Sequence, residues 1–453
     1  MSVIAAISTP NAAGGIGIVR VSGDGAFLIA DSCFRSVSGR KLSGMKGYTA
    51  AFGTVFDDSG DIDECVCIVY RAPHSYTGED TVELSCHGGL FIMQKVLRAV
   101  LSAGAVPASP GEFTRRAFLN GKMDLSQAES VMALISAQGT AALNASRNTL
   151  EGAVSRKTEE ISGLLLSAAA SLAAWADYPE DDVPAVEGKT LGETLSAAEA
   201  QLSRLIDRCD SGKAVTEGVR TVICGKPNVG KSTLMNLLTG YDRSIVTSVA
   251  GTTRDVVEET VRLGDVVLRL ADTAGIHETS DEVEKIGVSA AKKRLENADL
   301  IIAVFDISRP LSEEDEELLR ACRSRRAVAV INKTDLTQEL DTRTVGEYIP
   351  ETVELSAKSA DSADTLKCAI EKILGVDETD FTQEMLIGER QRQCAVNALS
   401  FVREALGALN AGLTLDAVNI SIDSALGELM SLTGKRVTEE TVNEVFAKFC
   451  VGK

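Results

Sequence analysis

The sequence predicts a multidomain protein of mixed α+β and α/β class, in which an N-terminal α+β domain precedes a discontinuous helical domain with an α/β domain inserted into it. Extended runs and helical spacing are mixed up to about residue 108. Stretches rich in Ala, Leu, Ser and Glu cover about 123–176 and 191–209 and return at about 384–450. Between them, short apolar strands alternate with helices, which is typical of a parallel sheet. The predicted domain boundaries are 1–120, 121–215, 216–378 and 379–453.

Individual elements of the N-terminal domain follow from local patterns. Apolar, β-branched runs predict strands over Ile16–Val21 and Cys65–Tyr70. The Asp-Asp-Ser-Gly run at 57–60 predicts a turn between extended segments. Apolar residues at helical spacing predict a helix over Leu90–Leu101.

Charge and hydropathy exclude several classes of protein. A net charge of −19 argues against a protein that coats nucleic acid by itself, because phosphate binding requires clustered lysine and arginine. The most apolar stretch, Leu164–Ala176, has 13 residues, whereas crossing a bilayer requires about 20. The N-terminal residues lack the pattern of a secretory signal and the ten cysteines are scattered, so the sequence predicts a cytosolic protein.

A glycine-rich motif predicts a phosphate-binding loop. It reads Gly-Lys-Pro-Asn-Val-Gly-Lys-Ser at 225–232, after the apolar run Val219–Cys224 and before a helix predicted over Thr233–Thr239. The N–H groups of such a loop surround phosphates, Lys231 neutralises the β- and γ-phosphate oxygens, and Ser232 ligates Mg²⁺. Strand, motif and helix together predict a P-loop domain that binds a nucleoside triphosphate.

Three later motifs, each after an apolar strand, select the nucleotide. Asp-Thr-Ala-Gly at 272–275 places Asp272 near the metal and the Gly275 amide near the γ-phosphate. In Asn-Lys-Thr-Asp at 332–335, Asp335 accepts two N–H groups of guanine, a pair that adenine does not offer. Ser-Ala-Lys at 356–358 completes the base pocket. The predicted nucleotide is therefore GTP.

The residue that orients the attacking water is not evident from these motifs. Ras-type GTPases carry a glutamine directly after Asp-x-x-Gly, but this chain has Ile276 there, and an aliphatic side chain cannot orient water. The candidates are the carboxylates of the next segment, Glu278, Asp281, Glu282 and Glu284. Carboxylates at a helix start are commonly solvated, so the residues alone leave this choice open.

Several further segments resemble the MnmE (TrmE) family of tRNA-modifying GTPases. They are GGIGIVR at 14–20, TGED at 77–80, GEFTRRAFLN at 111–120, GTTRD at 251–255, DEVE at 281–284 and the C-terminal FCVGK at 449–453. The likeness runs from residue 3 to the last residue. One departure is His277, where many relatives carry arginine, which changes only the local charge.

The resemblance implies both a layout and a reaction. The implied N-terminal domain binds folate and forms a constitutive homodimer, and a Ras-like GTPase domain is inserted into the helical domain. With the flavoprotein MnmG, such a protein adds an aminomethyl or carboxymethylaminomethyl group to C5 of the wobble uridine of certain tRNAs. A 5-formyl- or 5,10-methylene-tetrahydrofolate supplies the one-carbon unit, and GTP hydrolysis uses Mg²⁺ and K⁺.

The resemblance also assigns roles residue by residue. The implied GTP contacts are Asn228, Val229, Gly230, Lys231, Ser232, Thr233, Thr247, Ser248, Val249, Ala250, Gly251, Thr252, Thr253, Asp272, Thr273, Ala274, Gly275, Asn332, Lys333, Asp335, Ser356, Ala357 and Lys358. Ser232 and Thr253 would hold Mg²⁺, whereas the implied K⁺ ligands are Asn228, Thr247, Val249 and Thr252. Glu284 would polarise the attacking water through a second water. The implied folate contacts are Arg20, Glu83, Lys122 and Lys453.

Cys450 has two interpretations. Thr438 is placed as a helix N-cap, and Val442, Val445, Phe446, Phe449 and Cys450 then share one helical face, so spacing alone predicts a buried core cysteine. The resemblance instead implies that this cysteine is required for tRNA modification.

Two alternative functions share the nucleotide motifs. A ribosome-assembly GTPase that binds RNA directly would usually carry a basic RNA module, such as a KH domain, and none is evident in the sequence. A folate-dependent one-carbon transferase with a vestigial GTPase domain is disfavoured by the intact phosphate and guanine motifs.

Overall fold

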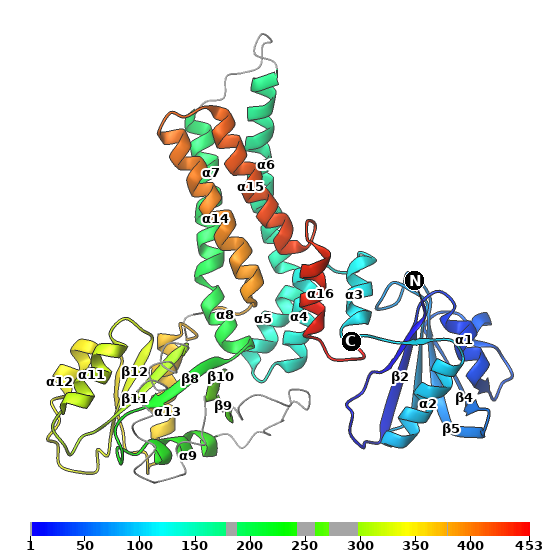
Figure 1. Cartoon of the computed structure of the whole chain (residues 1–453), viewed down its shortest axis with the longest axis horizontal. Helices are drawn as coiled ribbons and strands as arrows, with labels where there is room; N and C mark the ends of the chain where they lie inside the picture. The colour runs from blue at the N-terminus through cyan, green and yellow to red at the C-terminus, as the bar shows by residue number, and fades with distance from the viewer. Residues whose placement is uncertain (1, 178–187, 242–258, 271–297, 378) are drawn as a thin grey trace. The chain divides into compact units, whose positions relative to one another are not determined.

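The chain folds into two compact units. One comprises Met1–Met132 with Met430–Lys453, and the other comprises Ala133–Leu429. Figure 1 shows the computed structural model, which describes residues 2–177, 188–241, 259–270, 298–377 and 379–453. The C-terminal residues thus belong to the same unit as the N-terminal ones, which brings together segments that are distant in sequence.

The first unit is built on a seven-stranded sheet with the order β3-β4-β5-β6-β2-β1-β7. Its strands are β1 Ile4–Ile7, β2 Ile16–Ser22, β3 Phe34–Ser36, β4 Thr49–Asp57, β5 Gly60–Tyr70, β6 Thr81–His87 and β7 Val106–Pro107. The predicted strands, and the turn before Gly60, are confirmed. Alternate strand residues such as Val19 and Val21 are buried, as expected of a sheet with one covered face.

Helices α1 (Ala26–Cys33) and α2 (Leu90–Ser102) cover that buried face, and α2 confirms the predicted helix. Val96 and Val100 of α2 contribute to the same core as the sheet. Helix α3 (Glu112–Leu119), which was not predicted, buries Phe113. Helix α16 (Glu439–Ala447) packs against α3.

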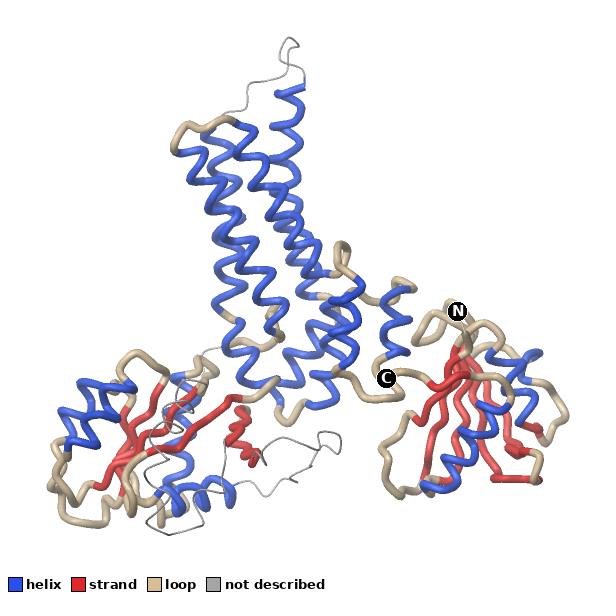
Figure 2. The backbone as a smooth tube through the Cα atoms, in the orientation of Figure 1, coloured by secondary structure: helices blue, strands red, loops and turns tan. Residues whose placement is uncertain are grey.

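The second unit contains a bundle of long helices, α6 (Ala153–Asp177), α7 (Gly188–Asp207), α14 (Glu389–Asn410) and α15 (Leu415–Thr433). Figure 2 shows these helices running side by side. Leu165, Leu195, Val402 and Ile422 contribute one from each helix to a single core. Segments on both sides of the α/β domain in sequence therefore bury one apolar face together.

The predicted helical stretch 123–176 is divided into α4 (Leu125–Ser136), α5 (Thr140–Leu150) and α6. The first break falls at Gly139, where an added Cβ would lie 2.7 Å from the Asp265 carboxylate. Asp265 Oδ1 accepts a hydrogen bond from the Ala141 N–H, so a residue of the α/β domain caps the N-terminus of α5. Helix α8 (Cys209–Thr216) joins the bundle to the α/β domain.

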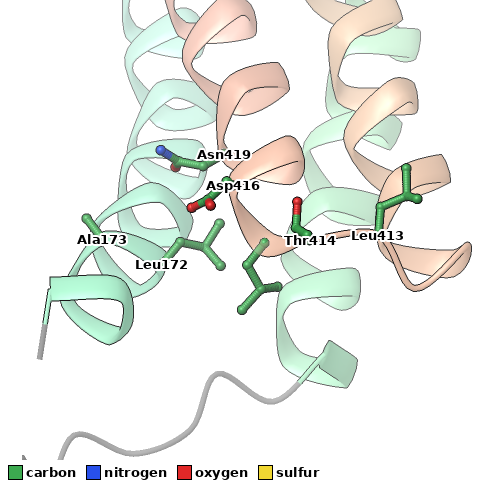
Figure 3. Close-up of a pocket in the computed structure, with 7 residues that line it drawn as sticks. Leu172, Ala173, Leu413, Thr414, Asp416 and Asn419 are labelled. Atoms are coloured by element: carbon green, nitrogen blue, oxygen red, sulfur yellow. The ribbon is translucent and has the colours of Figure 1, made fainter. Parts of the chain in front are cut away.

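At one end of the bundle, the loop between α14 and α15 borders a hollow of about 400 Å³ (Figure 3). Its lining residues are Leu172, Ala173, Leu413, Thr414, Leu415, Asp416 and Asn419. Among the described residues, the lining contains a carboxylate but no lysine or arginine, so it is unsuited to the phosphates of a nucleotide.

The α/β domain has a six-stranded sheet with the order β13-β12-β11-β8-β10-β9, parallel except at β9. The strands are β8 Val219–Cys224, β9 Glu259–Leu263, β10 Val266–Leu270, β11 Leu300–Asp306, β12 Ala327–Asn332 and β13 Thr352–Glu354. Its described helices are α9 Lys231–Tyr241, α11 Glu313–Cys322, α12 Thr342–Tyr348 and α13 Ser362–Ile373. Every residue of β11 and β12 is buried, as expected of central parallel strands.

The strands predicted before the nucleotide motifs are confirmed as β8, β10, β12 and β13. In parallel α/β sheets, ligands bind outside the carboxyl ends of the strands, where these motifs follow. Across the described parts of the chain, no helix is long and apolar enough to span a membrane.

Candidate functional site

The phosphate loop joins the end of β8 to the start of α9. Gly225 has φ +144°, and a Cβ there would lie 2.3 Å from the Val304 carbonyl oxygen of the neighbouring strand. Gly230 has φ +102°, and its Cβ would lie 2.2 Å from the Asn332 amide nitrogen. Both positions therefore require glycine, because residues with a side chain rarely adopt these φ angles and because neighbouring atoms leave no space for a Cβ.

The loop lysine is held inside the loop. Lys231 Nζ donates hydrogen bonds to the carbonyl oxygens of Gly225, at 2.6 Å, and Lys226, at 2.8 Å. Burial lowers the pKa of Lys231 below its ordinary value. These carbonyl oxygens are neutral and do not compensate the charge of the ammonium group. The phosphates of a nucleotide are anionic, so replacing the carbonyls by phosphate oxygens as hydrogen-bond acceptors for Lys231 is favourable.

The guanine motif holds the phosphate loop directly. Asn332 Nδ2 donates to the Val229 carbonyl oxygen at 2.8 Å, and Asn332 Oδ1 accepts from the Ala357 N–H at 2.9 Å. Lys333 Nζ donates to the Asn228 carbonyl oxygen at 2.7 Å. The loops after β8, β12 and β13 thus form one hydrogen-bonded unit.

Asp335, the predicted guanine acceptor, contacts the loop that follows β13. Ser356 Oγ donates to Asp335 Oδ1 at 2.9 Å, and Lys358 Nζ lies 3.4 Å from Oδ2. The hydrogen bond from Ser356 is the main cause that lowers the pKa of Asp335. The carboxylate is therefore ionised and acceptor-only at neutral pH, as a partner for two N–H groups must be.

Asp306 is a site residue that the sequence analysis missed. It ends β11 and is buried, and its carboxylate accepts hydrogen bonds from Lys333 Nζ at 2.6 Å and from Ser308 Oγ at 2.7 Å. Burial opposes its ionisation, but these donors together hold the pKa of Asp306 below its usual value. An aspartate at the end of an entirely apolar strand, with serine two residues later, was the available signal.

Several predicted site residues lie outside the described residues. They are Thr247, Ser248, Val249, Ala250, Gly251, Thr252, Thr253, Asp272, Thr273, Ala274, Gly275 and Glu284. Ile276 and His277 also lie there. Ser232 and Thr233 are described, and both are exposed in the first turn of α9.

The first unit contains a second cluster of charged residues. Arg20 on β2 faces Glu83 on β6 across the sheet, and Arg20 Nε lies 2.8 Å from Glu83 Oε1. Tyr70 Oη donates to the other carboxylate oxygen at 3.3 Å. The guanidinium carbon of Arg20 lies 5.8 Å from the ring centroid of Tyr76 and 5.5 Å from that of Phe113. The ion pair is only about one-sixth exposed, so water screens it weakly.

The C-terminal tail reaches this cluster. Arg20 Nη1 donates to the Gly452 carbonyl oxygen at 3.4 Å, and the Phe113 N–H donates to the Lys453 carbonyl oxygen at 3.2 Å. Burial, and next the charge of Arg20, lower the pKa of Lys453. The structure therefore brings Arg20, Glu83 and Lys453 together from both ends of the chain.

Cys450 is exposed, so the expectation from helical spacing that it is a core residue is wrong. Thr438 does cap α16, accepting from the Thr441 N–H, but the helix ends at Ala447. Its periodicity therefore does not extend to Cys450, although Phe449 is still buried. The thiol belongs to the tail that carries Lys453.

Lys122 lies at the edge of this region and not in the ion pair. Its Nζ donates to the Pro73 carbonyl oxygen at 3.0 Å. Pro73 and Tyr76 belong to the same loop between β5 and β6, and Tyr76 packs near Arg20. In this structure Lys122 holds the loop that borders the cluster.

The sheet, the phosphate loop and the guanine motif define a P-loop GTP-binding domain. Family models match this chain as the MnmE helical domain over residues 125–450 and as the GTP-binding protein TrmE N-terminus over residues 3–122. The chain therefore belongs to the MnmE family of GTP hydrolases, as the sequence resemblance indicated.

Curated relatives match along the whole chain. The chain is 38% identical over 453 residues to the tRNA modification GTPase MnmE of Clostridioides difficile, covering 99% of both chains. It is 41% identical over 457 residues to that of Geobacillus kaustophilus and 40% identical over 453 residues to that of Lachnoclostridium phytofermentans, again with 99% of both chains covered.

Proposed function

We propose that this chain is a K⁺-dependent GTPase that acts with the flavoprotein MnmG in tRNA modification. The proposed reaction is the folate-dependent addition of an aminomethyl or carboxymethylaminomethyl group to C5 of the wobble uridine of certain tRNAs. We also propose a cytosolic location. The tRNA assignment is supported by relatives that are tRNA modification GTPases over their full length.

One observation carries the proposal beyond GTP hydrolysis. The C-terminal tail brings Lys453 to the Arg20–Glu83 ion pair and leaves the Cys450 thiol exposed in the same unit. A purely structural tail would gain nothing from a partly buried ammonium whose pKa is lowered, since that burial costs free energy. The cluster is thus suited to a ligand.

The chemistry of the cluster fits a tetrahydrofolate derivative, which supplies a one-carbon unit when bound. Folates carry a ring edge with several N–H donors and an anionic glutamate tail. Glu83 can accept from N–H donors, while Arg20 and Lys453 can neutralise carboxylates. Lys122 is exposed and available to the same ligand. The buried ring of Phe113 and the partly exposed ring of Tyr76 lie beside Arg20 and supply apolar surface on one side of the cluster.

Two of the proposed cation ligands, Ser232 and Asn228, are among the described residues, and both are suited to this role. The Ser232 hydroxyl is exposed in the first turn of α9, where it can ligate Mg²⁺. Asn228 has φ +65° and an exposed side chain, while its backbone carbonyl is already engaged by Lys333. Its side-chain oxygen therefore remains for K⁺. The further proposed ligands are Thr253 for Mg²⁺ and Thr247, Val249 and Thr252 for K⁺.

A monovalent cation beside the phosphates supplies positive charge that offsets the charge developing during hydrolysis. Glu284 is the proposed residue that polarises the attacking water. We also propose the domain boundaries 1–120, 121–215, 216–378 and 379–453, and a homodimer formed through the N-terminal domain.

The proposal is tested by mass analysis of wobble nucleosides in tRNA from cells with and without this gene. We expect the C5-modified uridines to disappear when the gene is deleted and to return with the gene on a plasmid. Unchanged nucleosides would rule out the tRNA function while leaving GTP hydrolysis in place.

A further inference from the structure

The second residue of the phosphate-loop motif, Lys226, makes contacts outside the nucleotide site. Its backbone carbonyl accepts a hydrogen bond from Lys231. Its own side chain reaches the N-terminus of α11, where Nζ lies 2.8 Å from Asp315 Oδ2 and donates to Ser312 Oγ at 2.7 Å. One residue thus connects the phosphate-binding lysine to a neighbouring helix.

Asp315 is built into α11 and cannot easily move. Ser312 caps the helix, and Asp315 at the third helical position completes a capping box with it. The same carboxylate oxygen accepts from the Ser312 N–H at 3.0 Å and from Ser312 Oγ at 2.9 Å. Asp315 is 7% exposed and Lys226 is 25% exposed, so water screens this ion pair less than a surface pair.

We propose that the Lys226–Asp315 ion pair is a clamp that holds the phosphate loop in its binding shape before the nucleotide arrives. The loop is costly to order, because Gly225 loses much conformational freedom on fixing φ at +144° and the non-glycine residue Asn228 adopts φ +65°. Asn332 and Lys333 fix its second half through Val229 and Asn228. Lys226 fixes its first half, so the loop is held on both sides.

Holding the loop matters because an unformed loop must be ordered at the expense of binding energy. A ligand's apparent affinity falls in proportion to the fraction of protein in the competent shape. Lys226 contacts neither the predicted base pocket nor Asp335 in the structure. Loss of the clamp therefore weakens binding of phosphorylated nucleotides in general and does not alter the choice of base.

The test measures dissociation constants of GTP, GDP and inosine diphosphate for the full chain and five variants. We expect Lys226→Met and Asp315→Asn each to raise the constants for GTP and GDP about tenfold. The double variant should show the same loss as either single variant, since both remove one interaction. Lys226→Arg, which keeps the charge, should stay within about twofold of the parent protein.

Lys372→Met serves as the matched control. Lys372 forms an ion pair with Glu351 at 2.7 Å in the same domain, but Lys372 is 65% exposed and away from the phosphate loop. We expect no change in nucleotide affinity for this variant. Thermal melting of every variant identifies general destabilisation. Asp315→Asn keeps a side-chain oxygen that can still accept the hydrogen bond from the Ser312 N–H, so the helix cap is retained.

The proposal is overturned if Lys226→Met binds GDP as tightly as Lys372→Met does. Additive losses in the double variant, or a changed ratio of GDP to inosine diphosphate affinity, would also contradict it. Each of these results is independent of tRNA modification, so the clamp and the proposed tRNA function can fail separately.

Discussion

The side-chain amide of Asn332 donates a hydrogen bond to the Val229 carbonyl oxygen at 2.8 Å, across 103 positions of sequence. Asn332 is 2% exposed and also accepts from the Ala357 N–H. The strand end that is predicted to read guanine therefore also supports the predicted phosphate-binding loop. Base recognition and phosphate binding are mechanically connected in this domain, although different side chains carry them.

Asp335→Asn should lower GTP affinity selectively. The substitution replaces a carboxylate that can accept two guanine N–H groups with an amide that accepts fewer. Charge-assisted hydrogen bonds contribute about 1.5–3 kcal/mol each, so the dissociation constant should rise at least about tenfold. Titration calorimetry with GTP and ATP measures this, and Asp341→Asn, at the exposed cap of α12, is the control. Equal binding of both nucleotides by the parent protein contradicts the assignment.

GTP hydrolysis should be much faster in K⁺ than in Na⁺ at equal ionic strength. Sodium is smaller and more strongly hydrated, so oxygens spaced for K⁺ bind it poorly. Asn228→Ala should remove the difference, because only the side chain is lost while the carbonyl that accepts from Lys333 remains. Glu284→Ala should lower turnover with nucleotide binding retained. Phosphate release assays in the two chloride salts measure these rates, and identical rates in the parent protein exclude a potassium mechanism.

Cys450→Ser should abolish tRNA modification and leave GTP hydrolysis nearly unchanged. The thiol lies in the unit formed by the two ends of the chain, whereas the phosphate loop lies in the other unit. Cys368→Ser is the matched control, since that thiol is also exposed but sits on α13 of the GTPase domain. Nucleoside analysis and a GTPase assay on the same preparations give both readouts. Modification that survives in Cys450→Ser would remove this residue from the reaction.

Arg20→Met should weaken binding of 5-formyl-tetrahydrofolate by about tenfold or more, since it removes a cation and leaves Glu83 without its ion-pair partner. Arg35→Met is the control: its ion pair with Asp61 is more than 60% exposed on both sides. Calorimetric titration of the folate into both variants measures the difference. If the two variants bind alike, the Arg20–Glu83 cluster is not the folate site.

Alkaline pH should destabilise the first unit through its buried thiols. Burial is the largest cause that raises the pKa of Cys65 to about 12 and of Cys33 and Cys86 to about 11 from an ordinary value of 9.0. A raised folded-state pKa contributes stability that is present below pH 9 and lost as the pH rises to 11 or 12. Each thiol contributes at most about 1.4 kcal/mol per pH unit in this window.

Circular dichroism melts between pH 8 and pH 11 test this expectation. The midpoint should fall more steeply with pH for the parent protein than for Cys65→Ala, which lacks one titrating thiol. Parallel curves for the two proteins would show that Cys65 does not titrate on unfolding.

The sequence by itself determined the features that depend on near neighbours in the chain. The strands before the nucleotide motifs are apolar runs, and hydrophobic periodicity is a local signal, so β8, β10 and β12 were predicted within a residue or two. The phosphate loop was predicted for the same reason: strand, glycines, lysine and helix are consecutive. The family membership also followed from short motifs.

Only the tertiary structure decided which distant residues meet. The clamp joins Lys226 of the phosphate loop to Asp315 of α11, and a second ion pair joins Asp306 of β11 to Lys333 after β12; no local pattern specifies such pairs. The break at Gly139 follows from the approach of Asp265, more than a hundred positions away. Cys450 is exposed because α16 ends at Ala447 and the tail then follows the first unit, where Arg20 and Phe113 bind its backbone. Hydrophobic periodicity reports only on residues within one helix, whereas the path of the C-terminal tail depends on the surface against which it packs.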